Sequence, residues 1–429
     1  MLEKIKRIKK SASNRLQKSK DDKRYVVGLD IGTEYVKALV AEVEGGNATI
    51  IGVGRAHQSL GDMQAGAIAD ISSVVANCDK ALAQAEQQAG LSARTAVIGI
   101  AGELVKGRTT NVRIKRKSPE KAIDIAEFER IISIVQQRAE EKAHQTLAWE
   151  LGGKKLDIRL VNSALVGIDI DGYKVTNPIG FQGRNVMISL YTAFAPLIHI
   201  GALEKTAEEL DLDLLAVAAE PFAVSRSVIG DDSGSSMSAI LMDVGGGTTD
   251  IAVVNDGGVQ GTKMFGIGGR AFTKSIEKDL GIDFSDAEAL KLGLKADAIT
   301  KDKRAAVESA LEKTLDVWIH GVELALGEFT NLDNLPNRLL LCGGGASLDM
   351  LVERLESAGW YRELPLTKKP TIKLIRPDQV AGMTDATGMI KDHTLITAMG
   401  LVRVGIDTLT QANQEGSSFR QKIDKMLRV

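Results

Sequence analysis

Two aspartates stand directly before glycine-rich turns, where they could bring a carboxylate and bare backbone to a phosphate group. Asp30 lies in GLDIGTEYVKALV at residues 28–40, and Asp243 lies in LMDVGGGTTDIAVV at residues 241–254. Glycine carries no Cβ, so backbone N–H groups at these turns can approach phosphate oxygens. The two segments therefore predict a nucleotide held between two related domains.

Each segment continues through a second apolar run to a Gly-Gly turn, so both are typical of a β-hairpin with a phosphate loop at its tip. The groups expected to face the phosphates are backbone N–H groups and threonine hydroxyls. They belong to Gly32, Thr33, Glu34 and Tyr35 in the first turn and to Gly245, Gly246, Gly247, Thr248 and Thr249 in the second. A lone glycine turn is often only a tight turn, and an aspartate after a strand often caps the next turn. The pairing of the two motifs favours the functional interpretation.

A third glycine turn lies in LLLCGGGASLDML at residues 339–351. Its order of strand, turn and helix lets a ribose or an adenine approach bare backbone. The residues expected to lie beside the adenosine are Gly343, Gly344, Gly345 and Ala346.

The composition indicates a globular protein with more than one domain. The chain has 429 residues, of which 44% are hydrophobic, enough for two or more cores. No run approaches the roughly 18 apolar residues of a membrane span, and the N-terminus lacks the apolar centre of a signal peptide, so we expect a cytoplasmic protein. Cys78 and Cys342 have no zinc-ligand spacing and are interpreted as reduced core residues.

Charge is concentrated in the N-terminal tail. Residues 1–24 hold ten Lys and Arg against three Asp and Glu, a net charge of +7, and the rest holds 44 against 53, a net charge of −9. An acidic body argues against broad nucleic-acid binding, although a basic arm alone could still contact phosphate backbones.

The hydrophobic pattern divides the chain into the parts of two domains. We expect strands near residues 25–31, 35–43 and 48–54, and helices near 70–89, 124–143, 195–210, 285–293, 301–330 and 392–406. The expected parts are a basic tail (1–24), a first domain (25–93), an inserted subdomain (94–192), the rest of the first domain (193–230), a second domain (237–390) with a helical subdomain (270–335), a return to the first domain (391–410), a linker (411–416) and a terminal helix (417–429).

Several segments together resemble the actin, sugar kinase and heat-shock chaperone ATPase superfamily over roughly residues 25–406. These are the two phosphate turns, the AAEP segment at residues 218–221, LCGGGAS and TAMGL. Within the superfamily the chain is similar to the bacterial cell-division protein FtsA, in the insertion that ends in VTNPIGFQGRNV, in FSDAEALKL, in IGGRAFTKSI and at the C-terminus. The resemblance implies an α/β fold, actin-like with two domains, a central nucleotide cleft and an FtsA-type inserted α+β subdomain.

The resemblance also implies roles for further residues. ATP would lie in the cleft. Asp30 and Asp243 would face Mg²⁺, mostly through its waters, because Mg²⁺ sheds water reluctantly, and Glu220 would be a third acid near the metal or the attacking water. Gly268 and Gly269 would precede a helix at the site, and Glu288 and Lys291 would grip the ribose hydroxyls. The last two are otherwise a solvated charge pair three residues apart on a helix.

Hydrolysis is expected to be slow or absent, because no Arg or Lys stands inside either glycine turn to neutralise the terminal phosphate. Lys37 and Asp250 occupy the same place in the two hairpins, and both are interpreted as hairpin residues.

The C-terminal segment predicts an amphipathic helix for the membrane surface. Its apolar positions recur at offsets 0, 4, 7 and 8, and basic residues surround them. The apolar residues are Phe419, Ile423, Met426 and Leu427, and the basic ones include Arg420, Lys422 and Lys425. Such a helix suits anionic lipids, and the alternative is a helix docked on the body. The N-terminal tail is either a second membrane contact or a disordered arm.

The resemblance implies an FtsA-like, ATP-binding actin homologue. It would polymerise into filaments on the cytoplasmic face of the cell membrane, as a peripheral membrane protein, and would anchor the C-terminal tail of FtsZ at the septum. One alternative is a PilM-like platform protein for type IV pilus assembly, with which the chain shares an ALKLG stretch. A small-molecule kinase is the other, although the recognisable acids are all those of the nucleotide site.

Overall fold

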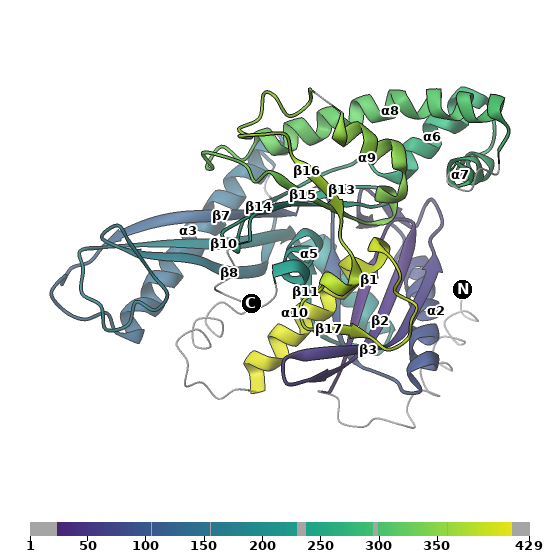
Figure 1. Ribbon diagram of the computed structural model, residues 1–429. Helices are drawn as coiled ribbons and strands as arrows, with labels where there is room; N and C mark the ends of the chain where they lie inside the picture. Colours follow the sequence, from purple (N-terminus) through teal and green to yellow (C-terminus); the bar gives the residue numbers. More distant parts are fainter. Residues whose placement is uncertain are drawn as a thin grey trace.

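The computed structural model describes residues 24–103, 105–154, 156–229, 237–294, 299–357 and 359–413. The N-terminal tail before Arg24, the polar segment 230–236 and the predicted membrane helix 417–429 lie outside the described residues. Within the described part, two large β-sheets and the helices between and around them form the molecule (Figure 1). No helix in the described ranges is both long and apolar enough to cross a membrane.

The first sheet has six strands in the order β11-β6-β1-β2-β3-β17. Its strands are β1 (Tyr25–Ile31), β2 (Tyr35–Glu44), β3 (Asn47–His57), β6 (Thr95–Ile100), β11 (Asp213–Ala219) and β17 (Met383–Asp385). β1, β2 and β3 form an antiparallel meander, and β6 and β11 extend it in parallel from β1. β1 and β6 are apolar along nearly their whole length because both of their faces are covered.

The second sheet has nine strands in the order β16-β15-β12-β13-β14-β7-β10-β8-β9. They are β7 (Lys106–Lys115), β8 (Ile158–Ile170), β9 (Tyr173–Val175), β10 (Asn185–Pro196), β12 (Ala239–Val244), β13 (Thr249–Asn255), β14 (Gly258–Phe265), β15 (Arg338–Cys342) and β16 (Thr371–Leu374). β12, β13 and β14 repeat the meander of β1, β2 and β3, so the two predicted hairpins are confirmed. A small pair, β4 (Met63–Gln64) and β5 (Ala67–Ile68), stands apart.

Two helices lie between the sheets and others cover their outer faces (Figure 1). α5 (Glu220–Ile229) and α10 (Ile396–Asn413) pack on each other between the sheets, and α2 (Ile71–Ala89) packs on β2 and β3. A Cβ at Gly54 would overlap the carbonyl of Ala81, so glycine on β3 allows α2 to approach closely.

The remaining helices cover the second domain and the insertion. Four helices lie on the second domain: α6 (Gly269–Leu280), α7 (Phe284–Gly293), α8 (Lys301–Gly327) and α9 (Asp349–Glu356). α3 (Ile125–Glu150) belongs to the insertion, and α4 (Leu197–Glu209) follows it, where the chain returns to the first domain. Short 3₁₀ turns are η1 (Gly344–Ser347), η2 (Pro377–Gln379) and η3 (His393–Leu395). Each domain and the insertion has its own core, centred in the second domain on the fully buried Trp318.

Three expected boundaries are wrong. β6 pairs with β1 and β11, so residues 95–100 belong to the first sheet and not to the inserted subdomain that was expected from residue 94. β17 pairs with β3, so the chain has returned to the first domain at Met383 and not at residue 391. α10 continues through Asn413, so the expected linker 411–416 begins as helix. The first two errors concern pairing between distant segments, which a local pattern does not encode, and the third concerns the end of a helix.

The inserted subdomain is joined to both domains at its base. β7 pairs with β14, through Gly107 opposite Thr262, so the insertion extends the sheet of the second domain. On the other side, the buried Asn162 accepts a hydrogen bond from the backbone N–H of Ala219 at 2.8 Å. The Tyr191 ring stacks on Phe222, with ring centroids 5.4 Å apart. These contacts connect the insertion to the residues on both sides of Glu220.

Candidate functional site

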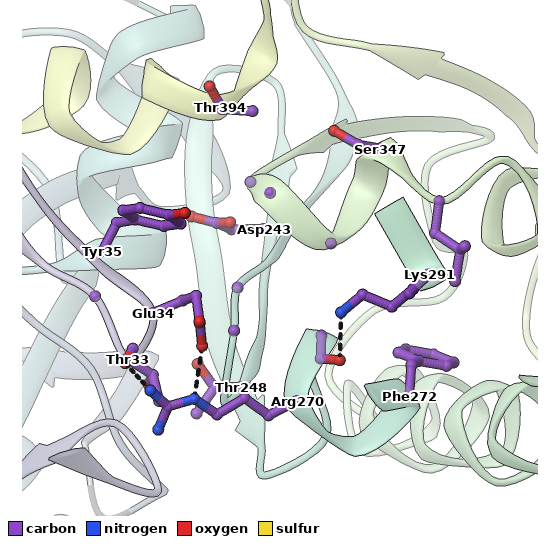
Figure 2. Close-up of a pocket in the computed structure, with 18 of the residues that line it drawn as sticks. Thr33, Glu34, Tyr35, Asp243, Thr248, Arg270, Phe272, Lys291, Ser347 and Thr394 are labelled. Carbon is purple, nitrogen blue, oxygen red and sulfur yellow. Dashed lines mark hydrogen bonds and ion pairs between the residues drawn. The ribbon is translucent and has the colours of Figure 1, made fainter. Parts of the chain in front are cut away.

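One cavity of about 480 Å³ lies where the tips of the two hairpins meet (Figure 2). Sixteen of the predicted site residues line it: Asp30, Gly32, Thr33, Glu34, Tyr35, Glu220, Asp243, Gly245, Gly246, Thr248, Gly269, Glu288, Lys291, Gly343, Gly344 and Gly345. Segments that are far apart in the sequence, from both domains, therefore share one cleft.

The two phosphate turns contact each other across this cleft. A Cβ at Gly246 would lie 2.9 Å from the Cβ of Glu34, and a Cβ at Gly247 would lie 2.7 Å from the hydroxyl of Thr33. Real Cβ atoms do not approach this closely, so glycine is needed for the two turns to meet. The backbone N–H groups of the turns are thereby brought to one cavity.

Four predicted residues support the cavity without lining it. Gly247 packs on Thr33, and a Cβ at Gly268 would lie 2.6 Å from the carbonyl oxygen of Gly245. Ala346 is buried. Thr249 is also buried, and its hydroxyl donates to the carbonyl of Ile267 at 2.7 Å while accepting from Trp318 Nε1 at 2.9 Å. The expectation that the Thr249 hydroxyl donates to a phosphate is therefore wrong, because this hydroxyl donates its hydrogen to Ile267 inside the second domain.

A buried cluster of four carboxylates and one ammonium group forms the floor of the cavity. The carboxylates are Asp30, Glu220, Asp243 and Asp250, and the ammonium is that of Lys37. Lys37 Nζ lies 2.9 Å from Asp30 Oδ2. Asp243 accepts a hydrogen bond from the hydroxyl of Thr397. The cluster holds four acidic groups against one cation.

Burial sets the ionisation of this cluster. It raises the pKa of Glu220 well above its usual range, and the carboxylates of Asp30, Asp250 and Asp243 raise it further. Burial and the neighbouring Asp243 do the same to the pKa of Asp250. Burial acts to lower the pKa of Lys37, but the carboxylates around it outweigh this effect and the pKa is raised, so Lys37 stays charged.

The cluster fits a hydrated cation. Within the described residues, no group of three or more His, Cys, Asp and Glu is arranged to hold a metal ion directly. Asp30 and Asp243 line the cavity from the two domains, and Asp250 Oδ1 is buried without a hydrogen-bond partner. A divalent ion that keeps its waters would reduce the excess negative charge and would supply donors to these oxygens.

Lys37 and Asp250 are site residues that the sequence reasoning set aside as hairpin residues. Lys37 pairs directly with Asp30 across the first hairpin, and Asp250 pairs with Asp243 across the second. Directly opposed residues in an antiparallel pair place their side chains on the same face. The equal spacing of the two pairs, seven residues each, was the signal that could have found them.

Arg270 is a further residue that the sequence reasoning missed. It is the second residue of α6, in the second domain, and its side chain reaches the first phosphate turn (Figure 2). Nε lies 2.7 Å from Glu34 Oε2, and Nη2 donates to the carbonyl of Thr33 at 2.7 Å. Neither glycine turn contains a Lys or Arg, but the side chain of Arg270 reaches the first turn from the second domain.

Glu288 and Lys291 form a partly buried pair at one side of the cavity. Lys291 Nζ lies 2.7 Å from Glu288 Oε2 and donates to the carbonyl of Gly269 at 3.0 Å. The side chain of Lys291 is only 12% exposed, so the alternative of a solvated surface pair is wrong. Apolar and charged side chains continue the cavity beyond it, namely Leu292, Leu294, Arg304, Glu308, Leu348 and Met350.

The chain is similar in sequence to known FtsA proteins and in fold to a solved chain of a type IV pilus complex. Residues 240–400 match the family model described as cell division protein FtsA. FtsA from Pseudomonas aeruginosa is 26% identical over 418 residues, which cover 92% of each chain. FtsA from Streptococcus pneumoniae is 27% identical over 83% of this chain and 76% of that protein. The resemblance to FtsA is therefore confirmed over most of the chain.

Among solved structures, a chain of the PilM-PilN type IV pilus biogenesis complex has a TM-score of 0.63 at 15% sequence identity. The similarity covers 89% of this chain and 98% of that one. At this identity the likeness concerns the fold alone. The predicted actin-like two-domain α/β fold is confirmed.

Proposed function

We propose that this chain, a relative of FtsA with an actin-like fold, binds ATP with Mg²⁺ in the cleft between its two domains. The observation that carries the proposal is the meeting of two phosphate turns, one from each domain, over a single cavity with a carboxylate behind each turn. A site with bare backbone N–H groups and buried acids suits a phosphate chain and its metal.

In this proposal, different residues bind the phosphates, the metal ion, the ribose and the adenosine. Backbone N–H groups of Gly32, Thr33 and Glu34, and of Gly245 to Thr248, hold the β- and γ-phosphates, and Tyr35 borders them. Asp30 and Asp243 would hold a hydrated Mg²⁺, which would supply positive charge against the phosphates. Glu288 and Lys291 contact the ribose, and Gly343 to Gly345 pass the adenosine.

Hydrolysis is slow in this proposal because burial disfavours the ionised form of the candidate base. Burial raises the pKa of Glu220, and a general base must be ionised to accept a proton. A bound cation favours the carboxylate and so couples the activity of Glu220 to nucleotide binding. The nucleotide then acts chiefly by fixing the angle between the domains.

Titration of the purified chain with ATP and Mg²⁺ tests the site. We expect binding heat and a thermal shift in the wild type, and a loss of both in Asp30→Asn and Asp243→Asn. Asp279→Asn is a matched control, because Asp279 pairs with Lys313 on the exposed side of the second domain. Absence of any heat and thermal shift with adenine nucleotides in the wild type would contradict the proposal.

We also propose that the chain polymerises on anionic membrane and anchors the C-terminal tail of FtsZ in cell division. The amphipathic pattern of residues 417–429 supports the membrane contact, and the basic tail before Arg24 supports a second one. Electron microscopy on a lipid monolayer with ATP and Mg²⁺ should show filaments. Deletion of both terminal segments should abolish co-sedimentation with anionic liposomes, and unchanged binding would refute the membrane contact.

The similarity in fold to a chain of the PilM-PilN complex supports one alternative, a pilus platform protein. The two proposals differ in the partner peptide. Binding of an FtsZ C-terminal peptide supports the first, and binding of a PilN peptide instead supports the second. Phosphorylation of a sugar by the purified protein would favour a small-molecule kinase over both.

A further inference from the structure

The first turn of α6 is fixed to the second phosphate turn by its backbone. The N–H of Gly269 donates to the carbonyl of Gly245 at 2.9 Å, and the N–H of Arg270 donates to that of Gly246 at 2.7 Å. The position of Arg270 therefore follows the position of the second domain. Its side chain is only 11% exposed and crosses the cleft to the first domain.

In the first domain, the guanidinium group of Arg270 is bound to the phosphate turn itself. It pairs with Glu34 and donates to the carbonyl of Thr33, and Figure 2 shows both contacts. Glu34 also binds His57 Nε2 at 2.8 Å, on its own domain. Arg270 thus links the two turns, and Glu34 is a carboxylate at a place where a terminal phosphate would bring further negative charge.

The other cations of the cavity have different partners. Lys37 lies among the buried acids and pairs with Asp30. Lys291 pairs with Glu288 at the other side, and Arg304 pairs with Glu308 on α8. Arg55 donates to the hydroxyl of Thr394 and lies over the ring of Tyr35. Arg270 is therefore the guanidinium that already lies on the turn proposed to hold the β- and γ-phosphates.

We propose that Arg270 is the residue that distinguishes a nucleoside triphosphate from a diphosphate. In the structure, Glu34 binds the guanidinium through Nε, while Nη2 donates to the carbonyl of Thr33. A terminal phosphate competes with Glu34 for the same group, because a guanidinium forms charge-assisted hydrogen bonds with carboxylates and phosphates alike. The inference rests on the proposed nucleotide site and assigns its specificity for the third phosphate.

The consequence concerns the angle between the domains. With a triphosphate, the second domain is tied to the first through phosphate and Arg270 together, in addition to the backbone contacts of the turns. With a diphosphate, Arg270 keeps its contacts with Glu34 and with the carbonyl of Thr33, and the link through a terminal phosphate is missing. The free energy of closing the cleft then differs between the two nucleotides, as a nucleotide-dependent assembly requires.

Affinities of the full chain for ADP and for the non-hydrolysable ATP analogue AMPPNP, each with Mg²⁺, test the inference by calorimetry. Arg270→Ala should weaken AMPPNP binding by about tenfold or more and ADP binding by about threefold or less. Glu34→Gln should move the ratio in the opposite direction, because it removes the competing carboxylate. Arg159→Ala is the control, since Arg159 pairs with Glu204 away from the cavity and its loss should leave both affinities unchanged.

Each outcome has one meaning. Equal weakening of both ligands in Arg270→Ala, or no change in either, overturns the inference while leaving the nucleotide site intact. Failure of the wild type to bind either ligand instead refutes the proposed function. If Arg270→Ala does not fold, Glu34→Gln decides, because it keeps the arginine, and an unchanged ratio in that variant overturns the inference.

Discussion

Replacement of Lys37 by methionine should strongly destabilise the protein, in a way that depends on pH. Methionine keeps the length of the side chain but removes the buried positive charge. The substitution leaves the buried Asp30 without its ion-pair partner at 2.9 Å and removes the cation that faces the other three buried acids. Removal of one partner from a buried ion pair costs about 3–5 kcal/mol. At about 2–4 °C per kcal/mol for a domain of this size, we expect Tm at pH 7 to fall by about 10 °C.

The pH dependence separates this cause from a simple packing defect. Without Lys37, the pKa values of Asp243 and Glu220 rise further, because Lys37 lowers both in the wild type. A carboxyl group with a raised pKa in the folded state binds more protons than in the unfolded state, so stability is gained as pH falls and lost as pH rises. The deficit of Lys37→Met relative to the wild type should therefore shrink between pH 7.5 and pH 5.

Thermal unfolding followed by circular dichroism across this pH range measures the effect. Lys205→Met is a matched control, because Lys205 forms exposed pairs with Glu208 and Glu209, and exposed pairs contribute about 1 kcal/mol or less. A Tm of Lys37→Met within about 2 °C of the wild type, where about 1 kcal/mol corresponds to 2–4 °C, would refute the account of the cluster. A deficit that does not change with pH would show that lost packing, and not charge, is the cause.

Three further predictions concern the site and its supports. Glu220→Gln should raise the free energy of unfolding above pH 7 and flatten its pH dependence. Burial raises the pKa of Glu220 above the usual 4.5, so the wild type loses stability as pH rises from that value, by up to about 1.4 kcal/mol per pH unit. Urea titrations at several pH values measure this, and a steeper dependence of the unfolding free energy on pH in the variant would contradict it. Thr397→Val should cost about 1–3 kcal/mol in chemical denaturation, because Asp243 loses a buried donor, and an unchanged midpoint would count against that bond. Gly107→Ala should cost about 1–3 kcal/mol and expose the insertion to limited proteolysis, because a Cβ would overlap the Thr262 hydroxyl where β7 meets β14, and wild-type protease resistance would argue against it.

The sequence alone was sufficient for the local features of the site. The two hairpins, the glycine turns and Asp30 and Asp243 follow from apolar alternation and from the need for glycine where backbone approaches a ligand, which are properties of short segments. The helices were also predictable, because their apolar spacing is local. The resemblance to FtsA then correctly identified the two-domain arrangement that relates these segments.

Only the tertiary structure decided which charges share the cleft and how the parts are joined. Arg270 and Glu34 are 236 residues apart, and no local pattern indicates that they meet. Likewise, β6 belongs to the first sheet through parallel pairing with β1 and β11, which requires distant segments to come together. Local preferences determine which strands and turns form, but burial, ion pairing and sheet membership depend on contacts made only once the whole chain has folded.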